Sequence, residues 1–392
     1  MTRPTTDPAK SSRTCVKPRL AIEMVCPYEP GKPIREVRQE LGLTRVVKLA
    51  SNENPLGPSP RAIDALGRSD LELHTYPDCD GWVLRDALAR HLGISIDGIV
   101  VGAGSSDLMR LVAEAFVDRG DEVILTDLCF SVYANVTRLA DATPAIVPLD
   151  DRLDHDLERM LSTVSGRTRA IFLASPNNPT GKAIPTADLE LFLEKLAPEV
   201  VCVLDLAYNE YVDPSLRVDP ARVVERHPNV IVLRTFSKVY GLAGLRVGYA
   251  VTHPTVARAL LLGQLPFSTS TAALHAAEVA LSDVAHTERS VVLNEKMRVR
   301  LYREFDRLGL SAVRSEANFV LVDVALEADT VFERLLRRGL IVRPVHEPRL
   351  RTCLRITTGT DEQIDLLIGM LEEALPAEGN APTRVESASW RR

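Results

Sequence analysis

Lys238 has the sequence surroundings that most suggest chemistry. It follows the apolar run 230–233 and precedes the mostly apolar stretch 239–245. Desolvation there would favour the neutral, nucleophilic form of its amine. Asp205 ends another apolar run upstream, and Arg246 lies shortly downstream. A lysine that forms an imine, an aspartate that keeps a pyridine nitrogen protonated and an arginine that binds phosphate would together fit pyridoxal 5′-phosphate.

Other segments could bind the phosphate and the planar ring of such a ligand. The run VVGAGSSD (100–107) predicts a strand and a Gly-rich turn, followed by a helix over 108–116, which together aim backbone N–H groups at an anion. Thr235 and Ser237 could add hydroxyl groups, and Phe130 could stack on a ring. Read alone, the turn could also be structural, or a dinucleotide fingerprint whose third glycine is replaced by Asp107.

Two more polar side chains follow predicted strands. The loop SPNNPTG (175–181) comes after the apolar run 170–173, so Asn178 would lie at the carboxyl end of a strand, where ligands bind in open α/β sheets. Tyr208, which follows Asp205 in the motif DLAY, could hydrogen bond a ring oxygen. These residues favour a planar ligand with polar edges.

Arg355 lies in a predicted strand of the C-terminal part of the chain, and Arg343 ends another. A planar guanidinium on a rigid strand suits a carboxylate or phosphate of a substrate. The alternative is that these arginines form ion pairs between two domains.

The elements that position these residues follow from short apolar runs that alternate with helical periodicity, which predicts an α/β fold with a mostly parallel sheet between helices. After Pro266, a long helical region over about 270–308 is followed by strand, helix and strand signals over 319–342. We expect a large cofactor-binding domain over 45–272 and a smaller α+β domain formed by 19–44 and 273–375. The polar ends 1–18 and 376–392 are expected to be disordered tails.

Composition narrows the function classes. Apolar residues make up 45% of the 392 residues and charged residues 26%, which excludes disorder of the whole chain. The net charge of −6 does not provide the excess of positive charge that favours binding to nucleic acid or to an anionic membrane. The six cysteines lack metal-ligand spacing, so no metal site is expected. Neither a membrane-spanning run nor a secretory signal is evident, so we expect a cytoplasmic protein.

The order of the motifs resembles the fold-type I, aspartate-aminotransferase-like pyridoxal-phosphate enzymes, and most of all histidinol-phosphate aminotransferases. The resemblance extends from about residue 27 to 371. The segments that carry it are PYEPGKP (27–33), LASNENPLG (49–57), YPD (76–78), GAGSSD (102–107), SPNNPTG (175–181), TFSK (235–238) and LRITTGT (354–360).

This resemblance implies a role for each matching residue. Lys238 would hold the cofactor as an imine and move the substrate proton, and Asp205 would pair with the pyridine nitrogen. Phe130 would stack on the ring, and Tyr208 and Asn178 would bond its phenolic oxygen. The phosphate would be held by Ser105, Ser106, Thr235, Ser237 and Arg246 and, across a homodimer interface, by the partner subunit's Tyr76. The anionic group of the substrate would face Tyr28, Arg343 and Arg355.

The implied reaction is transamination between a small-molecule amino donor and a 2-oxo acid, with histidinol phosphate and 2-oxoglutarate favoured. This sequence departs from its relatives on the substrate side, at 344–354, at 266–270 and at Leu206. An aromatic or other amino acid aminotransferase therefore stays open, as does a decarboxylase, cyclase or oxidase of a specialised pathway. A regulatory module that only binds the cofactor is disfavoured, because 26 residues precede Pro27 and leave no room for a DNA-binding domain.

Overall fold

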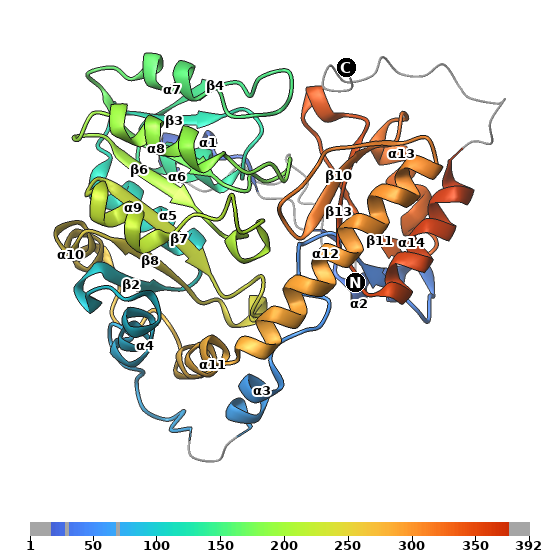
Figure 1. The fold of residues 1–392 in the computed structure, drawn as a ribbon, viewed down its shortest axis with the longest axis horizontal. Coiled ribbons are helices and arrows are strands. Elements are labelled where there is room, and N and C mark those ends of the chain that lie inside the picture. Colours follow the sequence, from blue (N-terminus) through green and yellow to red (C-terminus); the bar gives the residue numbers. More distant parts are fainter. Residues whose placement is uncertain (1–16, 28–30, 68–70, 376–392) are drawn as a thin grey trace.

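The computed structural model describes residues 17–27, 31–67 and 71–375 (Figure 1). The tails predicted at 1–18 and 376–392 therefore lie outside the described residues, except for residues 17 and 18. A seven-stranded sheet forms one side of the molecule and a smaller four-stranded sheet forms the other, as the ribbon shows. No helix in the ranges that the structure describes is both long and apolar enough to cross a membrane.

The larger sheet has the strand order β2-β8-β7-β6-β5-β3-β4. Its strands pair in parallel except β8, which runs antiparallel to both β2 and β7. The predicted mostly parallel sheet is thus confirmed. The strand bounds are β2 Ile99–Gly102, β3 Glu122–Thr126, β4 Thr143–Val147, β5 Thr168–Ala174, β6 Val201–Asp205, β7 Val230–Thr235 and β8 Gly248–Thr252.

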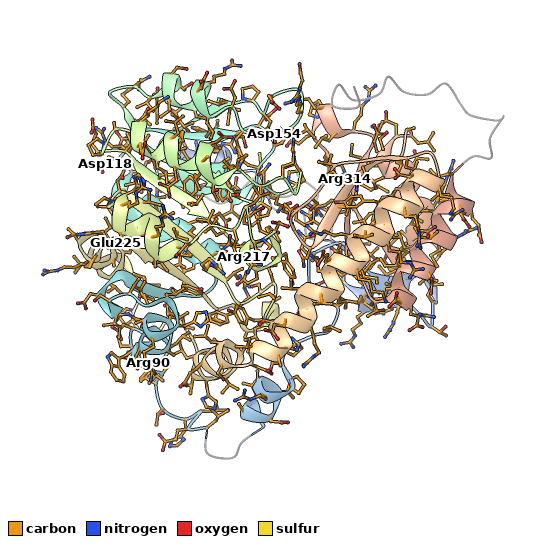
Figure 2. The ribbon with its side chains drawn as sticks, in the orientation of Figure 1. Arg90, Asp118, Asp154, Arg217, Glu225 and Arg314 are labelled. Atoms are coloured by element: carbon orange, nitrogen blue, oxygen red, sulfur yellow. The ribbon has the colours of Figure 1, made fainter. Side chains whose placement is uncertain are left out.

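Helices cover both faces of this sheet, which explains why its strands read as continuous apolar runs. One face packs on α5 (Ser105–Phe116), α6 (Val132–Leu139) and α10 (Pro254–Gly263). The other face packs on α3 (Pro60–Leu66), α4 (Trp82–Leu92), α7 (Leu157–Thr163), α8 (Thr186–Lys195), α9 (Pro220–Arg226) and α11 (Thr271–Ser282). Charged residues such as Arg90, Asp118 and Glu225 lie at the periphery of this side of the molecule (Figure 2).

The smaller sheet has the order β12-β13-β10-β9. Its bounds are β9 Ser311–Ala312, β10 Phe319–Asp323, β12 Arg343–Pro344 and β13 Cys353–Thr357, and its core includes residues of α12 (Val284–Arg307), α13 (Ala328–Leu336) and α14 (Asp361–Ala374). A separate parallel pair joins β1 (Val47–Lys48) to β11 (Leu340–Ile341). Short 3₁₀ helices lie at η2 Ile96–Gly98, η3 Asn209–Tyr211, η4 Ala243–Leu245 and η5 Pro348–Leu350.

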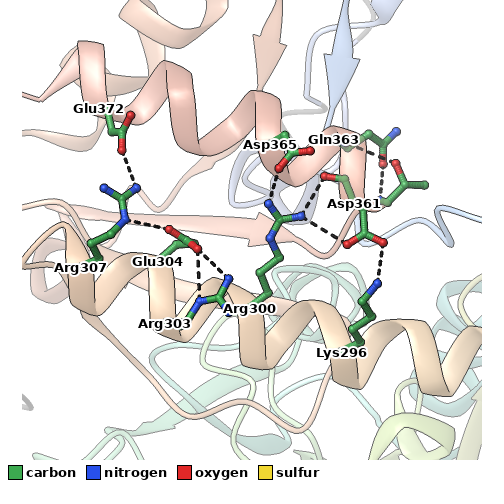
Figure 3. Close-up of polar contacts among 10 residues, drawn as sticks. Lys296, Arg300, Arg303, Glu304, Arg307, Asp361, Gln363, Asp365 and Glu372 are labelled. Atoms are coloured by element: carbon green, nitrogen blue, oxygen red, sulfur yellow. Dashed lines mark hydrogen bonds and ion pairs between the residues drawn. The ribbon is translucent and has the colours of Figure 1, made fainter.

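The helical region predicted over 270–308 consists of two helices that meet at Asp283. The Asp283 side chain accepts hydrogen bonds from the His286 backbone N–H and from the Ser59 hydroxyl, so it caps the start of α12. Ion pairs then tie the exposed side of α12 to α14, as Figure 3 shows for Lys296 and Asp361 (2.7 Å) and for Arg307 and Glu372.

The first elements contact both parts of the molecule. Helix α1 (Leu20–Glu23) packs on α6, and Arg19 forms an ion pair with Asp141 at 2.7 Å. Helix α2 (Ile34–Leu41) instead packs through Val37 near β1 and β11. The division of the chain into 45–272 on one side and 19–44 with 273–375 on the other stays a prediction.

Candidate active site

A cavity of about 240 Å³ lies at the carboxyl ends of the parallel strands β5, β6 and β7. Strand ends and the turns after them contribute most of its polar groups. It brings together the predicted residues Ser105, Ser106, Phe130, Asn178, Asp205, Tyr208, Thr235, Ser237, Lys238, Arg246 and Arg355.

Lys238 lies directly after β7 and is partly buried. Its ammonium group donates a hydrogen bond of 3.3 Å to the Ser51 carbonyl and lies 5.5 Å from the ring centroid of Tyr208. Burial lowers the pKa of Lys238 from 10.5 to about 8, and the positive charge of Arg355 contributes to the same shift. An appreciable fraction of this amine is therefore neutral and nucleophilic near neutral pH.

Asp205 is the last residue of β6 and is buried. Its carboxylate accepts a hydrogen bond of 2.7 Å from the Tyr133 hydroxyl and one of 3.1 Å from the Ala207 backbone N–H. Burial raises the pKa of Asp205, and the bond from Tyr133 offsets part of that rise. A cation beside the carboxylate would be stabilised here, because desolvated charges attract each other strongly.

Tyr208 and Asn178 contribute polar groups to the two sides of the cavity. The Tyr208 hydroxyl accepts a hydrogen bond of 3.0 Å from the Asn52 amide, and a hydroxyl that accepts one bond can also donate one. Arg355 donates a bond of 2.5 Å to the Asn178 amide oxygen, which leaves the NH₂ group of that amide as its donor. Both side chains can therefore donate to an oxygen on the edge of a ring.

An anion-binding end lies at the start of α5. This helix begins at Ser105, three residues earlier than the predicted start at 108, so the N–H groups of Ser105 and Ser106 belong to its first turn. Gly104 precedes it with φ of 88°, and a Cβ atom there would overlap the Arg246 guanidinium. The Arg246 guanidinium donates a hydrogen bond of 3.3 Å to the Ser237 hydroxyl. The N–H groups at the start of α5 and the Arg246 guanidinium therefore converge at this end of the cavity.

Arg343 does not line the main cavity. It lies in β12, paired in register with Arg355 of β13, and lines a second chamber of about 330 Å³. The two spaces share Phe130, Asn178 and Arg355 as lining residues, so they adjoin. Anything bound against Phe130 would reach this second chamber, which we call the arginine chamber.

Tyr76 and Tyr28 remain to be placed. Tyr76 is 81% exposed and stacks on Phe267, with ring centroids 4.7 Å apart, so it does not line the cavity of its own chain. Tyr28 lies outside the described residues. Their assigned roles stay predictions.

Sequence reasoning missed two groups that the structure brings to the cavity. Tyr133 comes from α6 and bonds Asp205, although its sequence neighbours mark it only as a helical residue. Asn52 has a φ of 55°, which is unusual for a non-glycine residue, and bonds Tyr208 from a loop far away in sequence. A polar run such as Ser51 to Asn54 after an apolar segment is the signal that could have drawn attention to Asn52.

The donor set fits pyridoxal phosphate. A nucleophilic amine, a buried carboxylate, two donors for a ring oxygen, an aromatic face and an anion site at a helix start all line one cavity. Each of these groups matches one end of that molecule, and the same chemistry in combination suits few other ligands.

Residues 44–371 match the family described as Aminotransferase class I and II. The chain is 43% identical to histidinol-phosphate aminotransferase 1 of Nitrosococcus oceani, over 90% of this chain and 95% of the relative. It is 42% identical to histidinol-phosphate aminotransferase of Moorella thermoacetica, over 92% and 94%.

Solved structures of aminotransferases superpose on this chain. The crystal structure of histidinol-phosphate aminotransferase from Sinorhizobium meliloti in complex with pyridoxal-5′-phosphate superposes with a TM-score of 0.84 at 29% identity. The superposition covers 93% of this chain and 98% of that one. The predicted aspartate-aminotransferase-like fold is confirmed, since an aspartate aminotransferase of Thermus thermophilus also superposes, with a TM-score of 0.78.

Proposed function

Because the chain belongs to the aminotransferase class I and II family and is a pyridoxal-phosphate-dependent aminotransferase, we propose that it transfers the amino group of histidinol phosphate to 2-oxoglutarate. The products would be imidazole acetol phosphate and glutamate. The relatives named histidinol-phosphate aminotransferase support this choice of donor.

One observation carries the proposal: the cavity that contains Lys238 and Asp205 adjoins a chamber lined by Arg343 and Arg355. An amino donor with its nitrogen at Lys238 and an anionic group several bonds away would fill both spaces. Two guanidinium groups suit a phosphate dianion better than a single carboxylate.

The roles of individual residues follow from their chemistry. Pyridoxal phosphate supplies an aldehyde that accepts the amino group and a ring that withdraws electrons. Asp205 would keep the ring nitrogen protonated, Phe130 would stack on the ring, and Tyr208 with Asn178 would bond its oxygen. The phosphate of the cofactor would be bound by the N–H groups of Ser105 and Ser106, the hydroxyls of Thr235 and Ser237, and Arg246.

Lys238 would carry the proton that leaves the substrate carbon during the reaction. Its lowered pKa lets it accept a proton from the substrate carbon near neutral pH and return it as the ammonium. Arg343 and Arg355 would bind the anionic group of the donor, with Tyr28 as a third contact, and would thereby fix the reacting carbon near the Lys238 amine.

We also propose that the protein is a homodimer in the cytoplasm. Tyr76, Phe267, Leu265 and Leu262 are exposed, and the rings of Tyr76 and Phe267 stack on each other. Exposed apolar side chains that lie close together are typical of an interface. In a dimer, the partner subunit's Tyr76 could then reach the cofactor phosphate.

The test is a set of half-reactions with single amino donors, followed through the visible absorbance of the bound cofactor. Histidinol phosphate should have a kcat/KM at least about tenfold above those of glutamate, aspartate and the aromatic amino acids. An aromatic amino acid as the best donor would contradict the proposal. Release of CO₂ or consumption of O₂ would instead indicate a decarboxylase or an oxidase.

A further inference from the structure

Two walls of the arginine chamber come from different parts of the fold, and Cys26, Pro27, Asn178 and Pro179 also line it. Leu128 and Ser131 belong to the loop after β3 of the larger sheet. The opposite wall consists of β12 and the residues after it, up to Glu347. The distance between the two walls therefore depends on how these segments are joined.

Arg349 joins them. It follows the second wall, in η5, and its guanidinium donates to the Asp127 carboxylate at 3.1 Å, to the Leu149 carbonyl at 2.9 Å and to the Asp150 carbonyl at 2.8 Å. Asp127 directly precedes the first wall. The same carboxylate accepts the backbone N–H groups of Leu128 and Leu149, each at 2.9 Å, so it is itself held firmly.

An apolar cluster surrounds this contact and also spans both parts. Leu128, Leu149 and Leu153 from the larger part pack with residues of the smaller part, namely Val313, Leu321, Val345, Leu350 and Cys353. Leu350, the neighbour of Arg349, is fully buried in the cluster. The arginine and its apolar support thus fix one side of the chamber to the other.

We propose that Arg349 is a positioning residue that sets the depth of the arginine chamber and thereby the length of the amino donor that the enzyme prefers. This inference rests on the proposed function, because it takes the arginine chamber as the site of the donor's anionic group. Arg349 is not among the described residues that line either cavity. It acts through Asp127 on the Phe130 loop and through η5 on the strand that carries Arg343.

The physical basis is the fixed span between the reacting carbon and the anion. A multidentate arginine bond to a carboxylate and two carbonyls has little freedom, so the spacing of the walls is well defined. A donor that is too short cannot contact the far arginines while its nitrogen reaches Lys238, and even small misplacement of a reacting group lowers rates strongly. Without Arg349, the distance between the two walls would no longer be fixed.

Histidine and histidinol phosphate are suitable probes, because they share the imidazole ring and differ in the position and charge of the anionic group. In Arg349→Ala, the KM for histidinol phosphate should rise roughly tenfold while kcat changes less than about threefold. The ratio of kcat/KM for histidinol phosphate to that for histidine should fall by about tenfold or more. Arg349→Lys, which keeps the charge but not the three bonds, should lie between these values.

Arg351→Ala is the matched control, because Arg351 lies in the same segment but pairs with Glu327 of the smaller part, at 3.7 Å. It should leave KM and the ratio unchanged. The proposal is overturned if Arg349→Ala folds with unchanged KM and ratio, or if Arg351→Ala has the same effect. It is also overturned if the KM change accompanies loss of cofactor absorbance, which would indicate a general structural role.

Two further outcomes separate this inference from the proposed function. If the wild-type protein does not use histidinol phosphate, the proposed function is wrong, and Arg349 is then tested with glutamate, whose KM should still rise roughly tenfold. If Arg349→Ala does not fold, Asp127→Asn and Arg349→Lys replace it. Both should raise KM, and an unchanged KM in both would overturn the proposal.

Discussion

The hydroxyl of Tyr133 donates a hydrogen bond of 2.7 Å to the carboxylate of Asp205. The tyrosine ring is buried, stacks on Phe172 with centroids 5.0 Å apart and meets Phe130 edge to face. Packing of the ring therefore fixes the direction of the hydroxyl. The bond also favours the ionised carboxylate, which the cofactor nitrogen requires.

Tyr133→Phe should weaken cofactor binding about tenfold, because a hydrogen bond to a charged, buried group is lost. The pKa of Asp205 should rise further, since the bond from Tyr133 lowers it. Titration of the apoprotein with pyridoxal phosphate measures the affinity directly.

Tyr302→Phe provides a control of the same kind. Its hydroxyl accepts a bond of 2.7 Å from the Ser315 backbone N–H, away from the cavity. That variant should keep the wild-type cofactor affinity. Equal affinities of wild type and Tyr133→Phe for pyridoxal phosphate would show that Tyr133 does not contribute to cofactor binding.

The rate at which the cofactor attaches to Lys238 should depend on pH. The lysine loses its proton as pH rises through its pKa of about 8, and only the neutral amine reacts. Attachment should therefore speed up about tenfold per pH unit below 8 and level off above it. Rapid-mixing absorbance of apoprotein with pyridoxal phosphate follows the reaction.

Arg355 provides a check on this explanation. Its positive charge lowers the pKa of Lys238, so Arg355→Leu should move the midpoint of the attachment profile to higher pH. A midpoint that stays in place, or moves to lower pH, would show that the arginine does not act on the lysine in this way.

Gly104→Ala should weaken cofactor binding through Arg246. The new methyl group would overlap the guanidinium, and the φ of 88° is unfavourable for alanine, so about 1 kcal/mol of stability should also be lost. Affinity should fall about tenfold as the arginine moves from the anion site. Gly120→Ala is the control, since Gly120 has a similar φ of 89° and nothing within 4 Å. Equal affinities in the two variants would contradict this use of Arg246.

The proposed dimer makes a prediction about mass. Sedimentation equilibrium should give about twice the chain mass of 43.1 kDa. Phe267→Glu should shift the protein toward the monomer, because a charge would enter the apolar surface around Tyr76. A wild-type protein that sediments as a monomer at micromolar concentration would contradict the proposed interface.

Much of the fold and part of the cavity could be predicted from the sequence, for local reasons. Buried parallel strands need apolar runs, and Asp205, Lys238 and Asn178 follow such runs directly, so their common place at strand ends could be inferred. Helix α5 begins at Ser105, three residues before the start that the sequence predicts, because the Gly-rich turn obscures where helical geometry begins.

The contacts that the sequence could not predict depend on packing between distant elements. Whether Tyr133 points at Asp205 depends on how α6 lies across β6, and no local pattern specifies that angle. Arg349 likewise bonds Asp127, which lies 222 positions away in the loop after β3, and Leu149, which lies 200 positions away after β4. The register of Arg343 against Arg355 is set by the pairing of β12 with β13.

The most direct measurement is reduction of the protein with borohydride in the presence of pyridoxal phosphate, followed by peptide mass mapping. We expect a pyridoxyl phosphate group on the peptide that contains Lys238, and none in Lys238→Ala. An unmodified Lys238, or modification of another lysine with full retention of activity, would contradict the proposal that this lysine holds the cofactor.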